Sequence, residues 1–436
     1  MFERVVVIGA GAAGLAATWA AAQRGAEIRL YDPSIGASCL TGGAVDDRPW
    51  EQVARAIEVL QLVPEAGPLP ESVRSFAQEL GLWRLPSQGE CLCRLATESG
   101  RMRLARGHDT SLLDVARLPA GARVVLPRLV RPEWDADSLA ASLSADAYAQ
   151  SRRIVFEAVN AKVLKHVGED RIASAELASR HDDPVRRQWL ADRLAEALVG
   201  AGGVGGRPSG SQRPVDAVLI GPWLGADKPI APWLAERLGV PVGEVLSGVG
   251  CAAGMRFESA RLALLSNLGV ELVPRSVSAI AAVQGELRVT VDEDEHRLTD
   301  AVVLAIGGLA AGGVVYDPPE QSAGQDLPLA GRAPFRLSVD APVRLQAQRQ
   351  PIDVVGSIHG PALDEVAWPV DADPGLLEAV GVACEGLEAA PQIFAAGDVV
   401  ADKPRTLLQA VYSGVLAGAA AAGEPGQIER SRRPRR

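Results

Sequence analysis

The chain has 436 residues, enough for two or three compact units, and its 47% hydrophobic and 22% charged residues are ordinary for a globular protein. A net charge of −10 argues against general nucleic-acid binding. The five cysteines, an odd number without the clustered spacing of an iron–sulfur centre, argue against a disulfide framework and favour a reducing compartment.

The first 32 residues predict a strand, a tight turn, a helix that ends at Gly25, and a second strand. Residues 5–22 carry no charge and resemble a signal peptide or a membrane span in length. They are, however, mostly alanine and glycine, which are only weakly apolar, and the glycines have a specific spacing. We therefore expect a cytoplasmic protein without a transmembrane segment.

Helices are predicted around residues 50–62 and 71–81. From about 85 to 245, short strands (ARVVLPRLV, RRIVFEAV and DAVLIG) alternate with amphipathic helices, and the six glycines of residues 200–210 predict a surface loop. A long helix, GMRFESARLALLSNLG, precedes several short strands and a buried apolar strand at 301–306. After a Pro- and Gly-rich stretch, the chain closes with the strand and turn IFAAGDVV and a helix that begins near Thr406.

The spacing Gly9-x-Gly11-x-x-Gly14 lies between the first strand and the first helix. In a dinucleotide fold the first glycine permits the tight turn, the second lets the backbone approach a pyrophosphate, and the third lets helix and strand pack closely. The free N–H groups of the helix N-terminus then face the phosphates. Asp32 ends the second strand, where a carboxylate accepts both ribose hydroxyls of an adenosine and repels a 2′-phosphate. We predict a dinucleotide site that also includes Ala10 and Ala13.

Two later segments favour FAD over NAD. Gly307 follows the buried strand at 301–306 and offers a second close backbone approach. Asp398 in IFAAGDVV, next to Gly397, can accept a hydroxyl of the ribityl chain that FAD carries and NAD lacks. The alternative for Gly397-Asp398 is a turn that caps the next helix.

Other segments are candidates for the flavin ring. Thr41-Gly42-Gly43 can let the backbone pass beside the flavin N5, or it can be a plain turn. The N-terminus of the helix near Thr406, with Lys403 or Arg405, would stabilise negative charge on a reduced flavin. Both cations can equally be solvated loop residues.

The substrate side is harder to interpret. Arg101, Arg103, Arg106 and His108 cluster in SGRMRLARGHD, and Arg256, Arg332 and Arg336 lie elsewhere. Arginine binds phosphate or carboxylate in a bidentate manner, but alternating arginines are also typical of a solvated strand face, which is the favoured interpretation.

Two further candidates stand alone. His359 is a candidate general base, although the sequence shows no partner for it. The Cys91-x-Cys93 pair has no companion ligands in the sequence, so we interpret it as structural and expect no metal site.

Together these motifs predict an α/β fold in which a discontinuous Rossmann-type FAD-binding domain, a parallel sheet with a crossover β-meander, is interrupted by an α+β cap domain. The predicted FAD-binding domain comprises residues 1–84, 250–312 and 385–425, the cap or substrate domain 85–249 and 313–384, and a flexible basic tail 426–436.

The chain resembles the flavoproteins with two dinucleotide-binding folds. Among them it resembles the anaerobic glycerol-3-phosphate dehydrogenase family, in particular the flavoprotein subunit that partners the catalytic one. The resemblance spans nearly the whole length. It is carried by the N-terminal fingerprint and by TGGAVD, TESGRMRLARG, ARVVLPRLVRPEWDADSLAASL, GPWLGADKPIAPWLAERL, the long helix from Gly254, and IFAAGDVV with Gln409, Ser413 and Gly414 behind it. These last three residues join the expected cofactor site through this resemblance.

Membership would imply a cytoplasmic, quinone-linked subunit that oxidises glycerol 3-phosphate to dihydroxyacetone phosphate. It would partner a catalytic FAD subunit and an iron–sulfur, membrane-associated subunit, which would hold it at the inner membrane. The family is described with FMN, whereas the adenosine fingerprint with Asp32 predicts FAD here. Two alternatives stay open: an electron-relay flavoprotein without its own substrate site, and a stand-alone FAD-dependent dehydrogenase or reductase of another small molecule.

Overall fold

The computed structural model describes residues 3–33, 35–48, 50, 66–201, 213–291, 295–308, 311, 313, 338–340, 345–346, 381–382, 384–401 and 403–423. The chain divides into two compact units. Unit 1 comprises Met1–Ser38, Pro70–Phe76 and Ala263–Arg436, and unit 2 comprises Cys39–Leu69 and Ala77–Leu262. These borders are not those of the predicted domains, whose boundaries stay a prediction.

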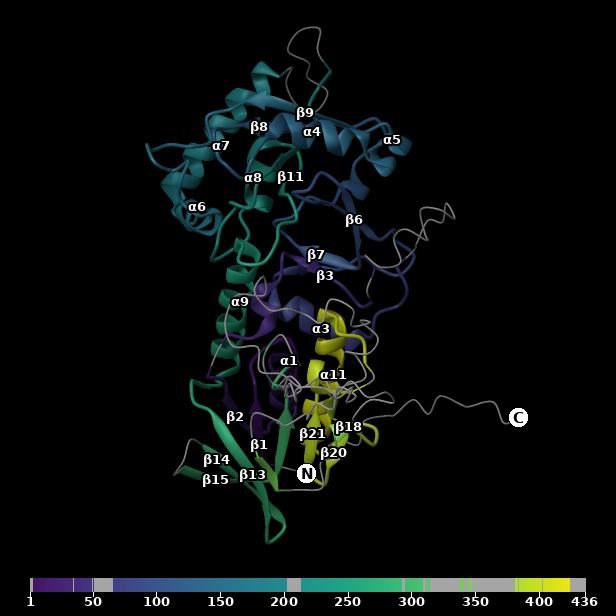
Figure 1. The fold of residues 1–436 in the computed structure, drawn as a ribbon, viewed down its shortest axis with the longest axis vertical. Coiled ribbons are helices and arrows are strands. Elements are labelled where there is room, and N and C mark those ends of the chain that lie inside the picture. The colour runs from purple at the N-terminus through teal and green to yellow at the C-terminus, as the bar shows by residue number, and fades with distance from the viewer. Residues whose placement is uncertain are drawn as a thin grey trace, which may run out of the picture. The chain divides into compact units, whose positions relative to one another are not determined.

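Unit 1 is built on a six-stranded sheet (Figure 1). In spatial order its strands are β12 (Leu272–Val273), β2 (Glu27–Tyr31), β1 (Arg4–Ile8), β16 (Ala301–Leu304), β21 (Ile393–Ala395) and β20 (Glu388–Ala390). The first five are parallel, and β20 joins the edge in the antiparallel sense. Strands from opposite ends of the chain therefore form one sheet, as the predicted discontinuous domain requires.

Two helices, α1 (Ala12–Ala22) and α11 (Leu407–Ala421), contact this sheet and lie side by side (Figure 1). Small residues bring them together. A Cβ atom on Gly414 would overlap the carbonyl oxygen of Ala13, and one on Gly418 would overlap that of Ala17. The small residues that make residues 5–22 resemble a membrane span in the sequence therefore allow α1 to pack closely on α11. Among the described residues, no helix is long and apolar enough to cross a membrane.

An antiparallel meander precedes β16 in the chain. It consists of β13 (Val277–Val283), β14 (Glu286–Val291) and β15 (Glu295–Thr299), and β17 (Ser338–Asp340) pairs with β13. Side chains of the meander share one core with alternate residues of β1 and β16, because successive residues of a strand face opposite sides of the sheet. The crossover meander is confirmed, and unit 1 has the predicted Rossmann-type fold. A small pair, β18 (Leu345–Gln346) with β19 (Gly381–Val382), lies between β17 and β20 in the sequence.

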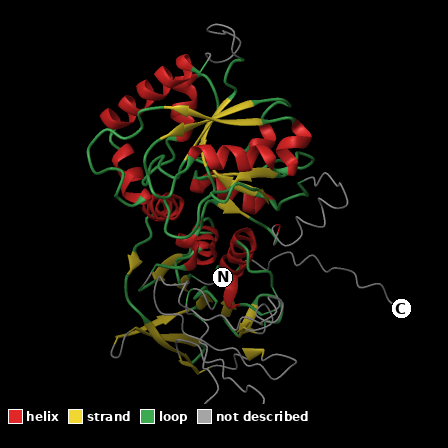
Figure 2. Ribbon diagram, turned by 45° about the horizontal axis from the view of Figure 1, so that its top comes forward, coloured by secondary structure: helices red, strands yellow, loops and turns green. Residues whose placement is uncertain are grey.

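Unit 2 contains a second parallel sheet of four strands, flanked by helices (red in Figure 2). Its strands, in spatial order, are β11 (Val242–Glu244), β10 (Ala217–Ile220), β8 (Arg123–Arg128) and β9 (Val155–Asn160). The helices are α4 (Ala136–Ala145), α5 (Ala147–Arg152), α6 (Ser174–His181), α7 (Pro184–Gly200) and α8 (Ala231–Leu238). This sheet is parallel because helices connect its successive strands, and antiparallel sheets also belong to the unit. The assignment of an α+β cap domain stays a prediction.

Smaller elements complete the unit. Two antiparallel sheets comprise β3 (Ala44–Val45), β7 (Gly107–Asp109) and β4 (Trp83–Arg84), and β5 (Cys93–Ala96) with β6 (Met102–Ala105). The remaining elements within the described residues are α3 (Glu71–Leu80), α9 (Ala252–Leu268), and the 3-10 turns η1 (Ala37–Leu40), η2 (Val115–Arg117) and η3 (Gly397–Val399).

Local sequence explains where several helices begin. The side chains of Asp135, Asp146 and Asp183 accept backbone N–H bonds at the starts of α4, α5 and α7, as preferred N-cap residues do. Gly239 ends α8 with a positive φ of 72°. The predicted helices at 71–81 and from Gly254 are confirmed as α3 and α9, while residues 51–65 and 202–212 lie outside the described residues.

We expect Gly418→Ala to lower the free energy of unfolding by about 1–3 kcal/mol, because the new methyl group would force α11 away from α1. Gly200→Ala is the matched control, since Gly200 ends α7 and a Cβ there meets nothing. Alanine should leave stability unchanged or raise it by up to about 1 kcal/mol at that position. Urea unfolding followed by circular dichroism measures both, and equal effects of the two substitutions would contradict close packing of α1 on α11.

Candidate dinucleotide-binding site

The turn between β1 and α1 depends on residues without a Cβ atom. Gly9 has a φ of +97°, and its N–H donates to the carbonyl oxygen of Tyr31 at 2.7 Å. A Cβ on Gly9 would overlap the carbonyl oxygen of Ala305, and a Cβ on Gly14 would overlap that of Gly9. The turn therefore joins β1, β2 and the end of β16 through backbone contacts that only glycine permits.

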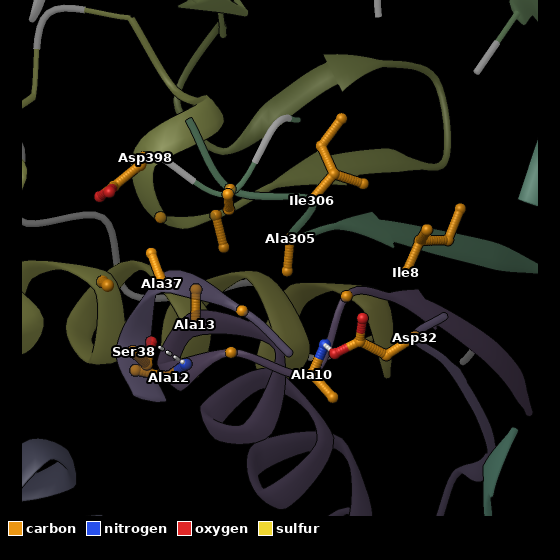
Figure 3. A pocket seen from close by; sticks show the side chains of 18 of the residues that line it. Ile8, Ala10, Ala12, Ala13, Asp32, Ala37, Ser38, Ala305, Ile306 and Asp398 are labelled. Atoms are coloured by element: carbon orange, nitrogen blue, oxygen red, sulfur yellow. Dashed lines mark hydrogen bonds between the residues drawn. The ribbon is translucent and has the colours of Figure 1, made fainter. Parts of the chain in front are cut away.

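Four segments that follow parallel strands line one pocket (Figure 3). They are the turn after β1, the residues after β2, the residues after β16, and the turn after β21. This is the edge of a parallel sheet at which ligands bind in open α/β folds. Of the predicted cofactor residues, the pocket lining includes Gly9, Ala10, Gly11, Ala13, Asp32, Gly307, Gly397 and Asp398.

Asp32 is held in place at one end of this lining. Its Oδ2 accepts the N–H of Ala10 at 2.9 Å, and its own N–H donates to the carbonyl oxygen of Val273 at 3.1 Å. The residue as a whole is 9% exposed. It is thus oriented by the glycine-rich turn itself, and its contact with an adenosine ribose stays a prediction.

Ser38 is a member of the lining that sequence reasoning missed. Its Oγ accepts the N–H of Ala12, the first residue of α1, at 2.9 Å. Gly11, which precedes α1, has no side chain that could cap the helix. No motif marks Ser38, because its contact with α1 is made across a separation of 26 residues in the sequence.

Asp398 lies at the other end of the drawn lining (Figure 3). Burial raises the pKa of its carboxyl group, and the positive charge of Arg405 partly offsets that rise. Gly397 has a φ of +77°, and a Cβ there would lie 2.7 Å from the Cβ of Ala13. The glycine therefore lets the turn after β21 approach α1, and it presents the adjacent carboxyl group to the pocket.

Ser413 on α11 fixes the turn that contains Gly397 and Asp398. Ser413 Oγ accepts the N–H of Gly397 at 2.9 Å and donates to the carbonyl oxygen of Gln409 or of Ala410 at 2.9 or 3.0 Å. Gly414 lies against Ala13, as described above. Gln409, Ser413 and Gly414 do not line the pocket, and their predicted contact with a cofactor is not tested by this geometry.

Thr41-Gly42-Gly43 belongs to unit 2. The N–H of Gly43 donates to Thr41 Oγ1 at 3.0 Å, and Gly43 has a φ of +104°. A Cβ on Gly42 would overlap the carbonyl oxygen of Ser247. These glycines are required by packing within unit 2, and their place beside a flavin stays a prediction.

Of the predicted catalytic residues, Lys403 and Arg405 lie within the part of the chain that the structure describes. The positive charge of Arg405 lowers the pKa of Asp398, against the effect of burial. Burial raises the pKa of the Cys384 thiol to about 11, and Lys403 opposes this rise, so Lys403 is close to Cys384. His359 lies outside the described residues, as do Arg332 and Arg336.

Three of the candidate substrate arginines are already engaged, and the first, Arg103, pairs with Asp46 at 2.7 Å. Arg106 is 1% exposed and donates to the carbonyl oxygens of Pro86 and Gly67 at 3.1 and 2.7 Å. The interpretation of MRLAR as a solvated face is therefore wrong for Arg106, since this side chain turns into the unit. Arg256 is fully buried and pairs with Asp109 and Glu244 at 2.8 and 2.7 Å.

Comparison with known proteins gives a partial match. Residues 3–108 match the family model described as pyridine nucleotide-disulphide oxidoreductase, a segment that includes the glycine turn and Asp32. No curated protein sequence matches the chain.

The chain is similar to several solved structures at low identity. One is the Diels–Alderase PyrE3 of pyrroindomycin biosynthesis, with 11% identity, a TM-score of 0.31, and coverage of 97% of this chain and 66% of PyrE3. Another is the 3-ketosteroid Δ1-dehydrogenase from Sterolibacterium denitrificans, with 13% identity, a TM-score of 0.26, and coverage of 70% of this chain and 48% of the dehydrogenase. A third is CtdE in complex with FAD, with 10% identity, a TM-score of 0.31, and coverage of 97% of this chain and 84% of CtdE. The chain thus spans less than two thirds of the length of the first two.

The raised pKa of Asp398 predicts a pH-dependent effect on the protein without cofactor. The folded state holds this proton more tightly than the unfolded chain does, so stability falls as the pH rises above the ordinary carboxyl range. Asp398→Asn removes the charged form. We expect a higher Tm than wild type at pH 7 and a difference that vanishes near pH 3, as Asp398 becomes protonated.

The exposed Asp227 supplies the control, because Asp227→Asn removes a surface charge alone. Thermal unfolding between pH 3 and pH 8 measures both variants. A lower Tm for Asp398→Asn at pH 7, or the same pH profile as Asp227→Asn, would show that burial does not penalise this carboxylate.

Proposed function

We propose that this chain is an FAD-dependent oxidoreductase. The observation that carries the proposal is the convergence of the glycine turn after β1, Asp32, Gly307 and Asp398 on one pocket at the carboxyl ends of parallel strands. The family match of residues 3–108 to pyridine nucleotide-disulphide oxidoreductases supports it.

The residues present fit an FAD. Gly11 lines the pocket directly before the N-terminus of α1, where a pyrophosphate can approach the free N–H groups, while Gly9 and Gly307 let the chain pack closely around this position. Asp32 supplies a carboxylate for the adenosine ribose, and Asp398 supplies one for a ribityl hydroxyl. When bound, FAD supplies a two-electron acceptor, and the chain's own residues bind and orient it.

For the substrate, we propose glycerol 3-phosphate. The resemblance to the flavoprotein subunit of anaerobic glycerol-3-phosphate dehydrogenase supports this choice. Oxidation of glycerol 3-phosphate to dihydroxyacetone phosphate removes two electrons and two protons, and in this proposal the electrons pass through the flavin toward quinone. In this proposal the chain works with a catalytic FAD subunit and an iron–sulfur subunit associated with the membrane.

One observation favours the electron-relay alternative. Among the described residues that line the pocket, the titratable side chains are Asp32 and Asp398. Each has a binding role in the proposal, so the described lining offers no separate general base for a hydroxyl substrate. A relay flavoprotein needs no such base.

The two aspartates distinguish FAD from FMN. Asp32 holds a group that FMN lacks, so Asp32→Ala should weaken FAD binding about tenfold or more, because a charge-assisted hydrogen bond is worth about 1.5–3 kcal/mol. FMN binding should not change. Asp398→Ala should weaken both flavins. Fluorescence titration of the cofactor-free protein measures these affinities, with Asp227→Ala as the control.

Asp32→Asn adds a second control, because an amide oxygen can still accept the N–H of Ala10 while the charge is lost. We expect an intermediate loss of FAD affinity. If Asp32→Ala binds FAD as wild type does while Asp398→Ala does not, the adenosine half makes no contact with Asp32, and FMN becomes the better assignment.

The substrate proposal predicts that glycerol 3-phosphate bleaches the flavin absorbance under anaerobic conditions, with the chain alone or with its partner subunits. No bleaching in either case excludes this substrate. Bleaching only in the assembled complex, with no turnover of an artificial acceptor by the purified chain, would identify the chain as the electron relay.

A further inference from the structure

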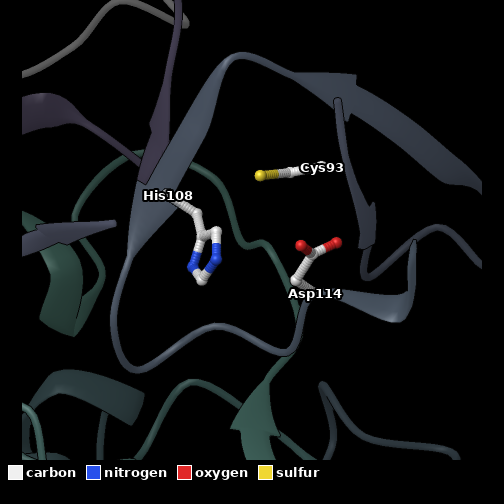
Figure 4. Close-up of side chains that lie close together, drawn as sticks. All are labelled: Cys93, His108 and Asp114. Carbon is white, nitrogen blue, oxygen red and sulfur yellow. The ribbon is translucent and has the colours of Figure 1, made fainter. Parts of the chain in front are cut away.

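Three side chains with metal-binding atoms converge inside unit 2. Cys93 begins β5, His108 lies in β7, and Asp114 caps η2. The sulfur, a ring nitrogen and a carboxylate oxygen all lie within 4.8 Å of one another (Figure 4). We propose that Cys93, His108 and Asp114 bind a divalent metal ion of the zinc type.

The imidazole of His108 is oriented by one ring nitrogen, so the other can bind a metal ion. Its Nδ1 lies 2.7 Å from the carbonyl oxygen of Asp109. A carbonyl oxygen only accepts, so Nδ1 carries the proton, and Nε2 of the neutral ring keeps its lone pair. Metal-bound histidines commonly donate their other N–H to a backbone carbonyl in this way.

That lone pair lacks a partner. His108 is 3% exposed, and no group in the part of the chain that the structure describes donates to Nε2. Buried polar atoms are normally satisfied, and an exception needs a cause such as an ion. A bound cation would satisfy the nitrogen.

Asp114 is anchored with one oxygen available. Its Oδ1 accepts the N–H groups of Arg94 and Ala116 at 3.0 and 3.1 Å. Both of these bonds use the same oxygen, so the carboxylate is oriented while Oδ2 remains for a ligand. The nearby thiol of Cys93 is buried, and burial together with Asp114 raises its pKa.

The charges balance in the metal-bound state. A thiolate and a carboxylate carry two negative charges, the imidazole is neutral, and a divalent ion makes the sum zero in a buried site. Binding displaces the thiol proton, which leaves to solvent, because a coordinating cysteine is deprotonated. Without the ion, the thiol donates to Asp114, which is the structural alternative.

The donor set favours zinc. Sulfur, imidazole nitrogen and carboxylate oxygen are the ligands that Zn²⁺ binds in tetrahedral sites, whereas Ca²⁺ and Mg²⁺ prefer oxygen. Bonds of about 2.0–2.3 Å place tetrahedral ligands about 3.3–3.8 Å apart, so side-chain shifts of about 1 Å close the site.

A cavity lies beside two of the three proposed ligands. His108 and Asp114 also line a cavity of about 500 Å³ together with Thr110 and the exposed Arg84 and Arg117. This size is within the range of small-molecule sites. The cavity gives an ion a path from solvent and leaves room for water as the fourth ligand. Three protein ligands and a water form an open zinc site rather than a closed structural one.

The test uses the full chain after treatment with a chelator, titrated with Zn²⁺ in competition with a chromophoric indicator. We expect one Zn²⁺ per chain. Cys93→Ser, His108→Gln and Asp114→Asn should each weaken binding at least tenfold. Cys91→Ser is the matched control, because Cys91 is exposed, two residues away, and outside the cluster. It should bind as wild type does.

Co²⁺ gives a second readout that needs no variant to fold. In the wild-type chain it should produce a near-ultraviolet thiolate-to-cobalt band and the visible bands of a tetrahedral site, both absent in Cys93→Ser. Sub-stoichiometric binding, a cobalt spectrum without the thiolate band, or a loss of binding only in Cys91→Ser would overturn the proposal and leave the thiol–carboxylate hydrogen bond as the explanation.

Discussion

At the turn between β1 and α1 of unit 1, backbone segments lie closer together than a Cβ atom on Gly9 or Gly14 would permit. Gly9 lies against the carbonyl group of Ala305, and Gly14 lies against that of Gly9. These contacts bring the ends of β1 and β16 together, with β2 joined through the hydrogen bond from Gly9 to Tyr31. The pocket lies where the ends of β1, β2, β16 and β21 meet, and the missing side chain of Gly9 lets the turn after β1 lie directly against Ala305.

The C-terminal part of the chain extends this arrangement. α11 packs on α1 through Gly414 and Gly418, and Ser413 on the same helix accepts the N–H of Gly397. One helix therefore both covers the sheet and holds the turn that carries Asp398. This coupling explains how a residue nearly 400 positions away in the chain lines the same pocket as Gly9. It also places the carboxyl group of Asp398 where burial raises its pKa.

Unit 2 treats its buried polar groups differently. Arg256 is surrounded by two carboxylates and a carbonyl oxygen, and Arg106 by two carbonyl oxygens. Such pairing is the usual condition for burying a charge. Among the described residues of this unit, His108 and His181 each have one ring nitrogen bonded to a backbone carbonyl and the other without a hydrogen-bond partner. His108 differs from His181 because it lies in a cluster with a thiol and a carboxylate.

The sequence by itself determined the elements whose signals are local. The glycine spacing predicted the β1–α1 turn, apolar runs predicted β8, β9, β10 and β16, and the Gly397-Asp398 turn after a short strand was found where expected. These follow from backbone conformation and periodicity, which neighbouring residues set. The meander before β16 was likewise visible as closely spaced short strands.

Only the tertiary structure decided which side chains meet. Ser38 caps α1 from another segment, and Arg106 turns inward although its strand resembles a solvated face. Cys93 looked isolated in the sequence, because His108 and Asp114 are brought to it by the pairing of separate strands and by a helical turn. Burial and convergence depend on contacts between residues distant along the chain, and a pattern of neighbouring residues carries no record of those contacts.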